Sequence, residues 1–294
     1  MIAYYETILG IDFPWAKYAQ INGREYVSGA MENTTATMHN DMVLQDARDL
    51  KDGNGWDNDP TDPGDSHSKN FCGTGVPNLA SSWHGTKVAS VIAALMNNST
   101  SNSNSLGGMV GVAPNTKIVP VRVTGPCGAA LSDIATAIRW AVGGSIKGVP
   151  VNGNPAKIIN LSLATPSSIC TPSLANAIAF ANARGAVVVV PSGNSKKLSG
   201  TTVNFTSPAN CVGAITVGSI KESGSRADYS NFGALVDVSA PGEGIVAASF
   251  NTLVSKPDTP ISHDYVTTSG TSFAAAHVSG VLALMYAAQP TLAP

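Results

Sequence analysis

The chain has 294 residues, of which 43% are hydrophobic and only 12% are charged, and its formal net charge is -2 at pH 7. This length can bury a sizeable core, and the composition is not that of a disordered chain. The balanced charge gives no basic surface for nucleic acid or for an anionic membrane. With so few charges, Ser, Thr, Asn and Gly must cover much of the surface, as is common in secreted proteins.

The hydrophobic pattern predicts strands and helices that alternate along the chain. In order, we expect a strand at 2–5, a polar segment at 22–65, a helix at 84–95, a loop at 97–108, a strand at 117–123, a helix at 132–142, a strand at 157–163, a helix at 172–184, strands at 186–190, 214–219 and 235–239, and a late helix that begins near 270. Such alternation indicates a mostly parallel sheet with helices on both faces. Because no repeat or linker marks a second unit, we expect residues 1–294 to form a single domain.

Two segments carry further structural signals. The run Ala186-Val187-Val188-Val189-Val190 is apolar throughout, which is typical of a strand buried on both faces. The late helix has apolar residues on every side, at 278, 281, 282, 284 and 285, so we expect it to be buried. Its His277, Ser279 and Gly280 favour a core helix over a membrane span.

Residues 52–65 form a loop that is dense in carboxylates and turn residues. Ca²⁺ takes about six to eight oxygen ligands, and a loop that alternates Asp with Gly, Asn and Pro can supply them. The loop is not a complete EF-hand, because no Glu follows at its twelfth position. We therefore predict a structural calcium site, with an ordinary solvated acidic loop as the alternative and no organic cofactor. The candidate ligands are Asp57, Asp59, Asp62 and Asp65.

The four cysteines are widely spaced and include no C-x-x-C pair; they are Cys72, Cys127, Cys170 and Cys211. This spacing gives little support to a zinc ribbon or a thioredoxin-like site and favours two disulfides formed in an oxidising compartment. The segment from Met1 to Tyr5 has no basic n-region and no cleavage site. We expect that a secretory signal was removed or that the chain is incomplete.

Three polar residues stand where predicted elements begin or end. His84 opens a helix, Asn194 follows the buried strand, and Ser272 opens the late helix. The carboxyl ends of parallel strands gather binding sites, and helix N-termini favour anions such as the oxyanion of acyl transfer. Each residue alone also has a structural interpretation: a structural histidine, an asparagine in a turn, and an N-cap at Thr271 or Ser272.

Together, His-Gly-Thr at a helix start, Asn after a buried strand and Gly-Thr-Ser at a late helix start resemble the subtilases, the subtilisin-like serine peptidases. The resemblance extends from about residue 2 to the last helix and includes Gly111-Val112-Ala113-Pro114 and Ala240-Pro241-Gly242. The D-G-N-G loop, the S-W-H-G-T stretch and the four cysteines are most similar to the secreted bacterial branch. The resemblance implies a three-layer α/β fold, an extracellular location, polypeptide substrates and a monomer, with no nucleic acid or membrane partner.

The resemblance also implies catalytic roles. Ser272 would be the nucleophile and His84 the general base. Asn194 would donate its side-chain amide, together with the Ser272 N–H, to the tetrahedral oxyanion. Glu6 falls where the family has its triad Asp, and Asp12 is the alternative acid. The order acid, histidine, serine is that of the family, and Ser272 lies in no G-x-S-x-G elbow, which argues against an α/β-hydrolase.

Substrate binding and cross-links follow from the same resemblance. Substrate main chain would pair by strand addition with a wall of the specificity pocket formed by Ser162, Leu163 and Ala164, and Ser192 and Gly193 would also bind substrate. The disulfides would join Cys72 to Cys127 and Cys170 to Cys211. Lys87 stands where many subtilases carry a second histidine, and Ala276 where they usually carry proline. Both ends of the chain are short for the family, so we expect it to be truncated.

Three functions are compared on this basis. The first is a secreted, calcium-stabilised serine endopeptidase in which Glu6 or Asp12 is the acid. The second is a subtilase-like protein, or an unstable truncated form, that binds peptide with little or no catalysis. The third is a calcium-dependent binding module that uses the loop at 52–65, and it leaves the His, Asn and Ser motifs unexplained.

Overall fold

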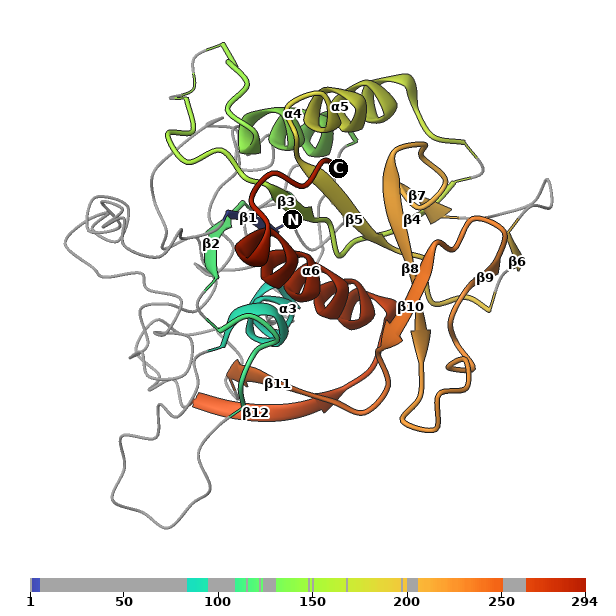
Figure 1. Cartoon of the computed structure of the whole chain (residues 1–294). Coiled ribbons are helices and arrows are strands. Elements are labelled where there is room, and N and C mark those ends of the chain that lie inside the picture. Colours follow the sequence, from blue (N-terminus) through green and yellow to red (C-terminus); the bar gives the residue numbers. More distant parts are fainter. Residues whose placement is uncertain are drawn as a thin grey trace, which may run out of the picture.

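The computed structural model describes residues 2–5, 84–94, 109–114, 116–121, 123, 131–147, 149, 151–167, 169–196, 198–199, 206–250 and 263–294. Its centre is a six-stranded sheet with the order β10-β8-β5-β3-β1-β2 (Figure 1). The strands are β10 (Val238–Pro241), β8 (Ala214–Ile220), β5 (Val187–Pro191), β3 (Ile158–Asn160), β1 (Ile2–Tyr5) and β2 (Lys117–Pro120). The pairs β10 with β8, β8 with β5 and β5 with β3 are parallel, so the sheet is mostly parallel, as predicted.

The first strand runs against both of its neighbours. Ile2 of β1 pairs with Asn160 at the carboxyl end of β3, and Tyr5 pairs with Lys117 at the start of β2. The chain therefore leaves β1 beside the amino-terminal end of β3, on the side of the sheet opposite the carboxyl ends of β3 and β5. The sequence predicted the strand at 2–5 but carried no signal for its direction.

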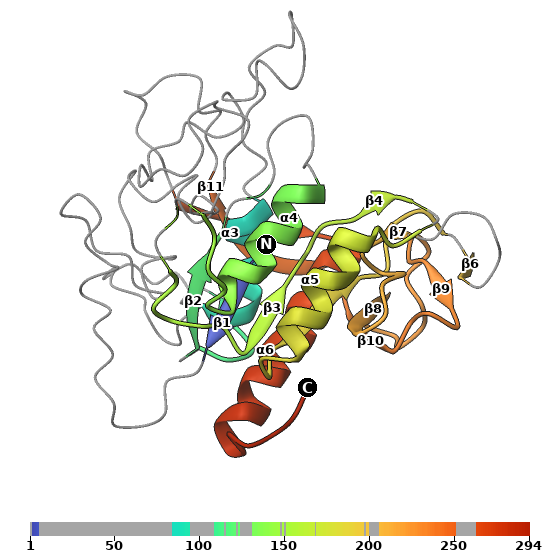
Figure 2. The same cartoon turned by 90° about the horizontal axis from the view of Figure 1, so that it is seen from above.

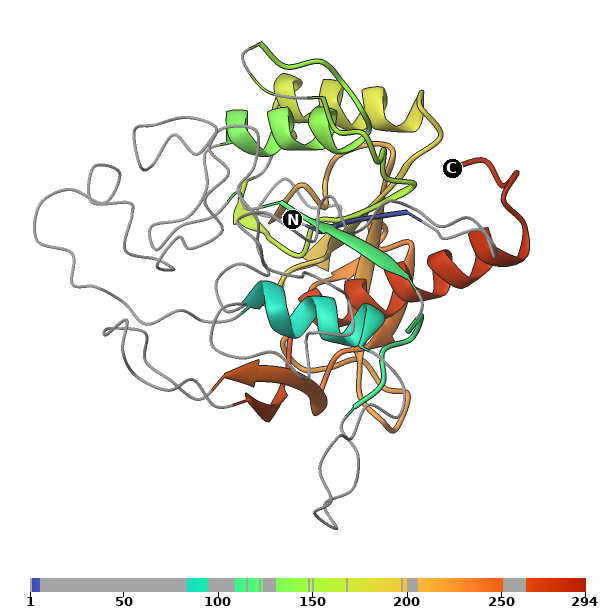
Figure 3. The same cartoon turned by 90° about the vertical axis from the view of Figure 1, so that its left-hand side faces the viewer.

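Helices cover both faces of the sheet, which confirms the three-layer expectation. On one face lie α3 (His84–Ala93) and α6 (Thr271–Ala288), and on the other lie α4 (Leu131–Ala141) and α5 (Pro172–Asn182). Figure 3 shows these layers, with α3 and α6 in teal and red below the sheet and α4 and α5 in green and yellow above it. Figure 2 shows α4 and α5 side by side.

The apolar run of β5 explains how one strand serves both layers. Val187 and Val189 belong to the core beneath α3 and α6, whereas Val188 and Val190 belong to the core beneath α4 and α5. Successive side chains of a strand point to opposite faces. A strand that is buried on both faces must therefore be apolar at every position.

In the described part of the chain, three two-stranded ribbons lie outside this sheet. They pair β11 (Ile245–Phe250) with β12 (His263–Thr268), β4 (Thr165–Pro166) with β7 (Thr206–Ser207), and β6 (Leu198–Ser199) with β9 (Phe232–Gly233). The first of them leads the chain directly into α6 (Figure 1).

The third strand is shorter than its apolar pattern suggests. Leu161 still donates its N–H to Val189 O at 2.8 Å, but the Leu163 N–H turns back to Leu161 O at 2.7 Å. Ser162 therefore leaves the regular ladder just past the carboxyl end of β3. This turn frees its backbone carbonyl for other partners.

The expectation that the late helix is buried on all sides holds only for its first half. Phe273, Ala274, Ala275 and Ala276 are at most 2% exposed, whereas Val281, Leu284 and Met285 are 46–49% exposed. The helix is apolar and long enough to span a membrane by length and composition, but 56% of it is buried inside the fold. Its first half is thus the core helix that the sequence predicted, while its second half presents one apolar face outward.

The disulfide between Cys170 and Cys211 is present, as the resemblance implied. It joins the residue that precedes the N-cap of α5 to the segment that precedes β8. The second implied pair, Cys72 with Cys127, lies outside the described residues.

Replacing both Cys170 and Cys211 by serine is expected to lower the free energy of unfolding by about 3–4 kcal/mol. The cross-link spans 41 residues, and closing a loop of that size removes conformational freedom from the unfolded chain. Denaturant unfolding of the native chain and of the double variant measures the difference. Equal midpoints and slopes for the two proteins would contradict the prediction.

Candidate active site

Ser272 is the second residue of α6, and the helix start is held by Asn194, a residue in the turn after β5. The N-cap is Gly270, and no side chain of the cap makes a hydrogen bond, so the interpretation of Thr271 or Ser272 as a mere N-cap is wrong. Instead, the Thr271 N–H donates to Asn194 Oδ1 at 2.9 Å, and the Thr271 hydroxyl donates to the same oxygen at 2.7 Å. Asn194 therefore supplies the acceptor that the first turn of a helix lacks.

Asn194 reaches this position because the chain turns sharply after β5. Gly193 has a φ of +101°, a conformation that side chains rarely adopt, and a Cβ there would lie 2.5 Å from Asn231 Nδ2. The Gly193 N–H donates to Thr271 Oγ1 at 3.2 Å, which ties the turn to α6.

The two bonds to Oδ1 determine which way the Asn194 amide points. With its oxygen held by Thr271, the Nδ2 of this exposed residue is the atom left to donate. Within the described part of the chain, neither Asn194 Nδ2 nor the Ser272 N–H has a hydrogen-bond partner. Two N–H donors beside a helix N-terminus suit a developing negative charge.

His84 is the first residue of α3 and meets Ser272 at one oxygen atom. Its Nε2 lies 3.0 Å from the carbonyl oxygen of Ser162, and Ser272 Oγ donates to that same oxygen at 3.3 Å. The imidazole also packs edge-on against Phe273, with ring centroids 5.8 Å apart. Three distant segments, α3, the turn after β3 and the start of α6, therefore converge on the Ser162 carbonyl.

The surroundings of His84 favour its neutral form. Burial lowers the pKa of the imidazole below its ordinary value, and the nearby positive charge of Lys87 lowers it further. The hydrogen bond to Ser162 O opposes both effects. An imidazole that stays neutral near pH 7 is able to accept a proton, which is what a general base requires.

Replacing Lys87 by methionine is expected to raise the pKa of His84, because the substitution removes a positive charge that disfavours the imidazolium. If neutral His84 is required, the acid limb of the kcat/KM profile moves to higher pH in this variant. Hydrolysis of a peptide substrate, measured from pH 4 to 8, locates the limb. Lys87→Arg keeps the charge and is the control, so an equal displacement in both variants would contradict the electrostatic cause.

The predicted substrate-binding residues differ in exposure. Ser162 is buried, Leu163 is half-buried and Ala164 is exposed, so this segment runs from the core to the surface. Ser192 is fully buried, and its hydroxyl donates to Asn231 O at 3.2 Å inside the fold. Gly193 is buried as well, so neither of these two residues lies at the surface.

Several candidates lie outside the described residues: Glu6, Asp12, Asp57, Asp59, Asp62 and Asp65. The triad acid and the calcium ligands therefore stay predictions of the sequence. Among the residues that the structure does describe, no three His, Cys, Asp or Glu side chains gather in a way that could hold a metal ion.

Sequence reasoning missed three residues that organise the site. Thr271 orients the Asn194 amide, and Asn231 supports the same turn by donating from Nδ2 to Ser192 O at 2.7 Å and by accepting from the Ser195 N–H at 3.1 Å. Asn160 lies buried in β3 and bonds to Ser162 Oγ. The only sequence signal for Asn160 is a polar residue inside an apolar strand.

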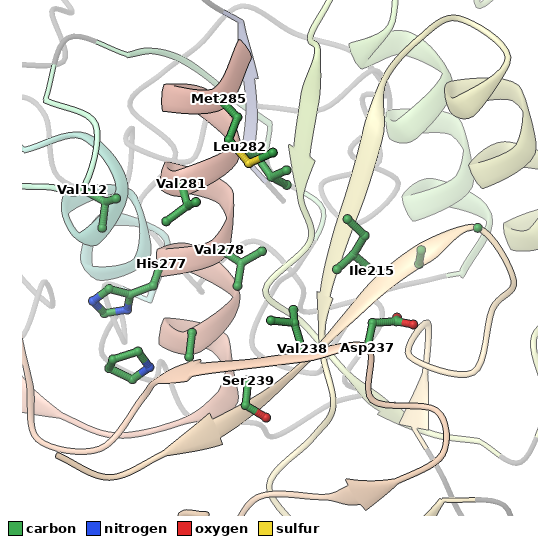
Figure 4. A pocket seen from close by; sticks show the side chains of 14 residues that line it. Val112, Ile215, Asp237, Val238, Ser239, His277, Val278, Val281, Leu282 and Met285 are labelled. Atoms are coloured by element: carbon green, nitrogen blue, oxygen red, sulfur yellow. The ribbon is translucent and has the colours of Figure 1, made fainter. Parts of the chain in front are cut away.

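A separate groove of about 740 Å³ runs along the second half of α6 (Figure 4). Side chains of the helix form one wall, among them Val278, Val281, Leu282 and Met285, and Ile215 and Val238 form part of the other. Of the proposed catalytic residues that the structure describes, neither His84 nor Asn194 nor Ser272 lines this groove. The groove is therefore lined by part of the apolar face of α6.

Comparison with known proteins places this arrangement in a family. The profile of the subtilase family matches residues 30–294, so the match begins after Glu6 and Asp12 and not near residue 2. The chain is 44% identical over 271 residues to an extracellular protease of Xanthomonas campestris pv. campestris, and 37% identical over 250 residues to an extracellular basic protease of Dichelobacter nodosus. These alignments cover 89% and 83% of the chain but only 44% and 39% of the relatives, so the chain spans less than half of their length.

Solved structures give the same assignment. A protease from Pseudoalteromonas arctica superposes with a TM-score of 0.70 at 41% sequence identity, covering 86% of this chain and 72% of that one. A cold-adapted subtilisin-like serine proteinase superposes with a TM-score of 0.53 at 30% identity, covering 72% of this chain and 63% of that one. With the sequence motifs, the three-layer fold and the family profile in agreement, this chain belongs to the subtilase family.

Proposed function

We propose that this chain is the peptidase domain of a secreted serine endopeptidase that hydrolyses polypeptides through an acyl-enzyme. The observation that carries the proposal is the convergence of Ser272 Oγ and His84 Nε2 on the Ser162 carbonyl oxygen, beside the open N–H groups of Ser272 and Asn194. The names of the two bacterial relatives support an extracellular location. We also propose that the protein is a monomer and that it has no nucleic acid or membrane partner.

In the proposed reaction, Ser272 Oγ attacks the carbonyl carbon of the scissile peptide bond while His84 takes its proton. The tetrahedral intermediate that forms carries a negative oxygen, and Asn194 Nδ2 and the Ser272 N–H would donate to it. The imidazolium then returns its proton to the leaving amine, which leaves an acyl group on Ser272. Water, activated by the same imidazole, releases that acyl group.

The position of the Ser162 carbonyl suggests that substrate binding itself prepares Ser272 and His84 for the reaction. A carbonyl oxygen only accepts, so the imidazole that lies 3.0 Å from it carries its proton on Nε2 and is not yet arranged as a base. Substrate main chain that pairs with Ser162 offers a backbone N–H to the same oxygen. Binding would therefore release both the imidazole and the Ser272 hydroxyl from this oxygen, and once the ring proton has moved to Nδ1, Nε2 can accept the hydroxyl proton.

The triad acid is proposed at Glu6, with Asp12 as the alternative. Such a carboxylate holds the proton on Nδ1, so that Nε2 is free to act as base. The antiparallel course of β1 is the observation against Glu6, because Tyr5 lies at the edge of the sheet opposite Ser162. The variants Glu6→Gln and Asp12→Asn decide between them, because neutralising the residue that acts as the triad acid is expected to lower turnover by about 10⁴.

Calcium remains a proposal for the loop that contains Asp57, Asp59, Asp62 and Asp65. Its support is the density of oxygen ligands in the sequence and the membership of the chain in the family. A bound ion there would stabilise the folded state by mass action and take no part in the chemical steps.

One experiment tests the proposed function against peptide binding without catalysis. The purified chain is incubated with a fluorophosphonate probe and, separately, with casein, each with and without Ca²⁺. Labelling of Ser272 together with release of casein fragments supports the endopeptidase. A protein that is folded by circular dichroism in the presence of Ca²⁺ but neither labels nor cuts would overturn it.

A further inference from the structure

A chain of buried side-chain hydrogen bonds links the body of α6 to the proposed nucleophile. Ser279 Oγ lies 3.0 Å from Asn160 Oδ1, and Asn160 Nδ2 lies 2.7 Å from Ser162 Oγ. Ser162 Oγ in turn lies 2.9 Å from the backbone oxygen of Ser272. Asn160 and Ser279 are 0% exposed and Ser162 is 8% exposed, so water does not compete for these bonds.

The direction of every bond in this chain follows from its last member. The Ser272 carbonyl only accepts, so the single proton of the Ser162 hydroxyl is donated to it. Ser162 Oγ must then accept from Asn160, which requires that the amide nitrogen face it. The amide oxygen is thereby turned to Ser279, whose hydroxyl donates to it.

Ser162 and Ser272 consequently hold each other twice. The Ser162 hydroxyl donates to the Ser272 carbonyl, and the Ser272 hydroxyl donates to the Ser162 carbonyl. The Ser162 carbonyl is also the contact of His84 Nε2. Loss of the Ser162 hydroxyl bond would therefore loosen Ser272 relative to the Ser162 carbonyl, the atom at which the proposed nucleophile and base meet.

We propose that Asn160 is a positioning residue for Ser272 and His84, acting through Ser162. By giving an N–H to Ser162 Oγ, Asn160 leaves the proton of that hydroxyl for the Ser272 carbonyl and so fixes the start of α6 against the turn after β3. The inference rests on the proposed function of the same site. Asn160 touches neither substrate nor reacting atoms in this role.

The first test compares two buried asparagines. Asn160→Ala removes the link to Ser162, whereas Asn152→Ala removes an amide that is only 4% exposed and whose bonds go to Ala141 O and the Asn154 N–H. Both variants are expected to lose stability. Only Asn160→Ala is expected to lower kcat and the rate of fluorophosphonate labelling of Ser272, each by about 10- to 100-fold. Small misplacements of reacting groups have effects of that size.

The second test asks whether the effect passes through Ser162. In a Ser162→Ala background the hydroxyl that Asn160 orients is absent, so Asn160→Ala is expected to add no further loss of kcat. Asn160→Asp keeps the volume but offers an acceptor to Ser162, which draws the hydroxyl proton away from Ser272. It is expected to slow labelling at least as much as Asn160→Ala. If Asn160→Ala does not fold, Ser279→Ala is measured instead, because it removes the hydrogen bond that holds the amide oxygen of Asn160.

A third measurement does not depend on catalysis. NMR titration of the His84 ring, assigned by its loss in His84→Gln, is expected to show a lower pKa in Asn160→Ala, because a looser Ser162 carbonyl holds the imidazolium less well. Asn152→Ala is expected to leave this pKa unchanged. Native labelling rates and an unchanged His84 titration in a folded Asn160→Ala protein would overturn the inference. A native chain that is folded but does not label refutes the proposed function, while the titration still decides the role of Asn160.

Discussion

Ser272→Ala is expected to abolish both casein hydrolysis and fluorophosphonate labelling, with a loss on the order of 10⁶ in turnover. The hydroxyl at this position is the one that meets His84 at the Ser162 carbonyl and stands beside two free N–H donors. Removing it takes away the atom that is proposed to form the acyl-enzyme. Initial rates with a chromogenic peptide and mass spectrometry of the labelled protein measure the effect.

A matched serine separates this effect from a general disturbance of the helix start. Ser269 is exposed and accepts from the Gly244 N–H through its side chain at 3.0 Å, only three positions before Ser272. Ser269→Ala is expected to keep near-native turnover. His84→Ala is expected to cost about as much as Ser272→Ala, and the double variant no more than either alone, because nucleophile and base act as a unit. Labelling that persists in Ser272→Ala would place the nucleophile elsewhere.

Asn194→Ala is expected to lower kcat by about 10² to 10³ and to change KM little, because a donor to the oxyanion acts in the transition state and not in the bound ground state. The geometry supports this expectation: Thr271 holds Asn194 Oδ1 and leaves Nδ2 as the free donor. Steady-state kinetics with one peptide substrate separate kcat from KM.

The Asn194→Ala substitution also removes the acceptor for the first N–H of α6, so a second variant is needed. Asn194→Asp keeps an oxygen for Thr271 but has no N–H to donate, and it adds a negative charge beside the proposed oxyanion. It is expected to be at least as slow as Asn194→Ala and closer to the native chain in thermal stability. Native kcat in both variants would show that Asn194 only supports the helix start.

Much of the fold was predictable because it depends on short-range patterns. The apolar run at 186–190 predicted a strand buried on both faces, and the structure confirms it by placing alternate valines in two different cores. The helical spacing after His84 predicted α3 from its first residue. These signals can be read from the sequence alone because a helix or strand is formed by residues that are neighbours in the sequence.

The failures concern contacts between elements. The direction of β1 and the exposed face of α6 at Val281, Leu284 and Met285 depend on which elements lie alongside, and a local pattern carries no such information. Ser192, a predicted substrate-binding residue, is completely buried, which no local pattern indicated. Its partner Asn231 lies 39 positions away in the chain.

The amino-acid sequence by itself determined the layered α/β architecture, the family and the identity of the histidine, asparagine and serine that stand at element ends. Only the tertiary structure decided that Thr271 orients Asn194, that Ser162 is the meeting point of His84 and Ser272, and that Asn160 lies behind it. Hydrogen bonds between residues 77 to 119 positions apart form only when strands and helices pack, so no window of the sequence contains them.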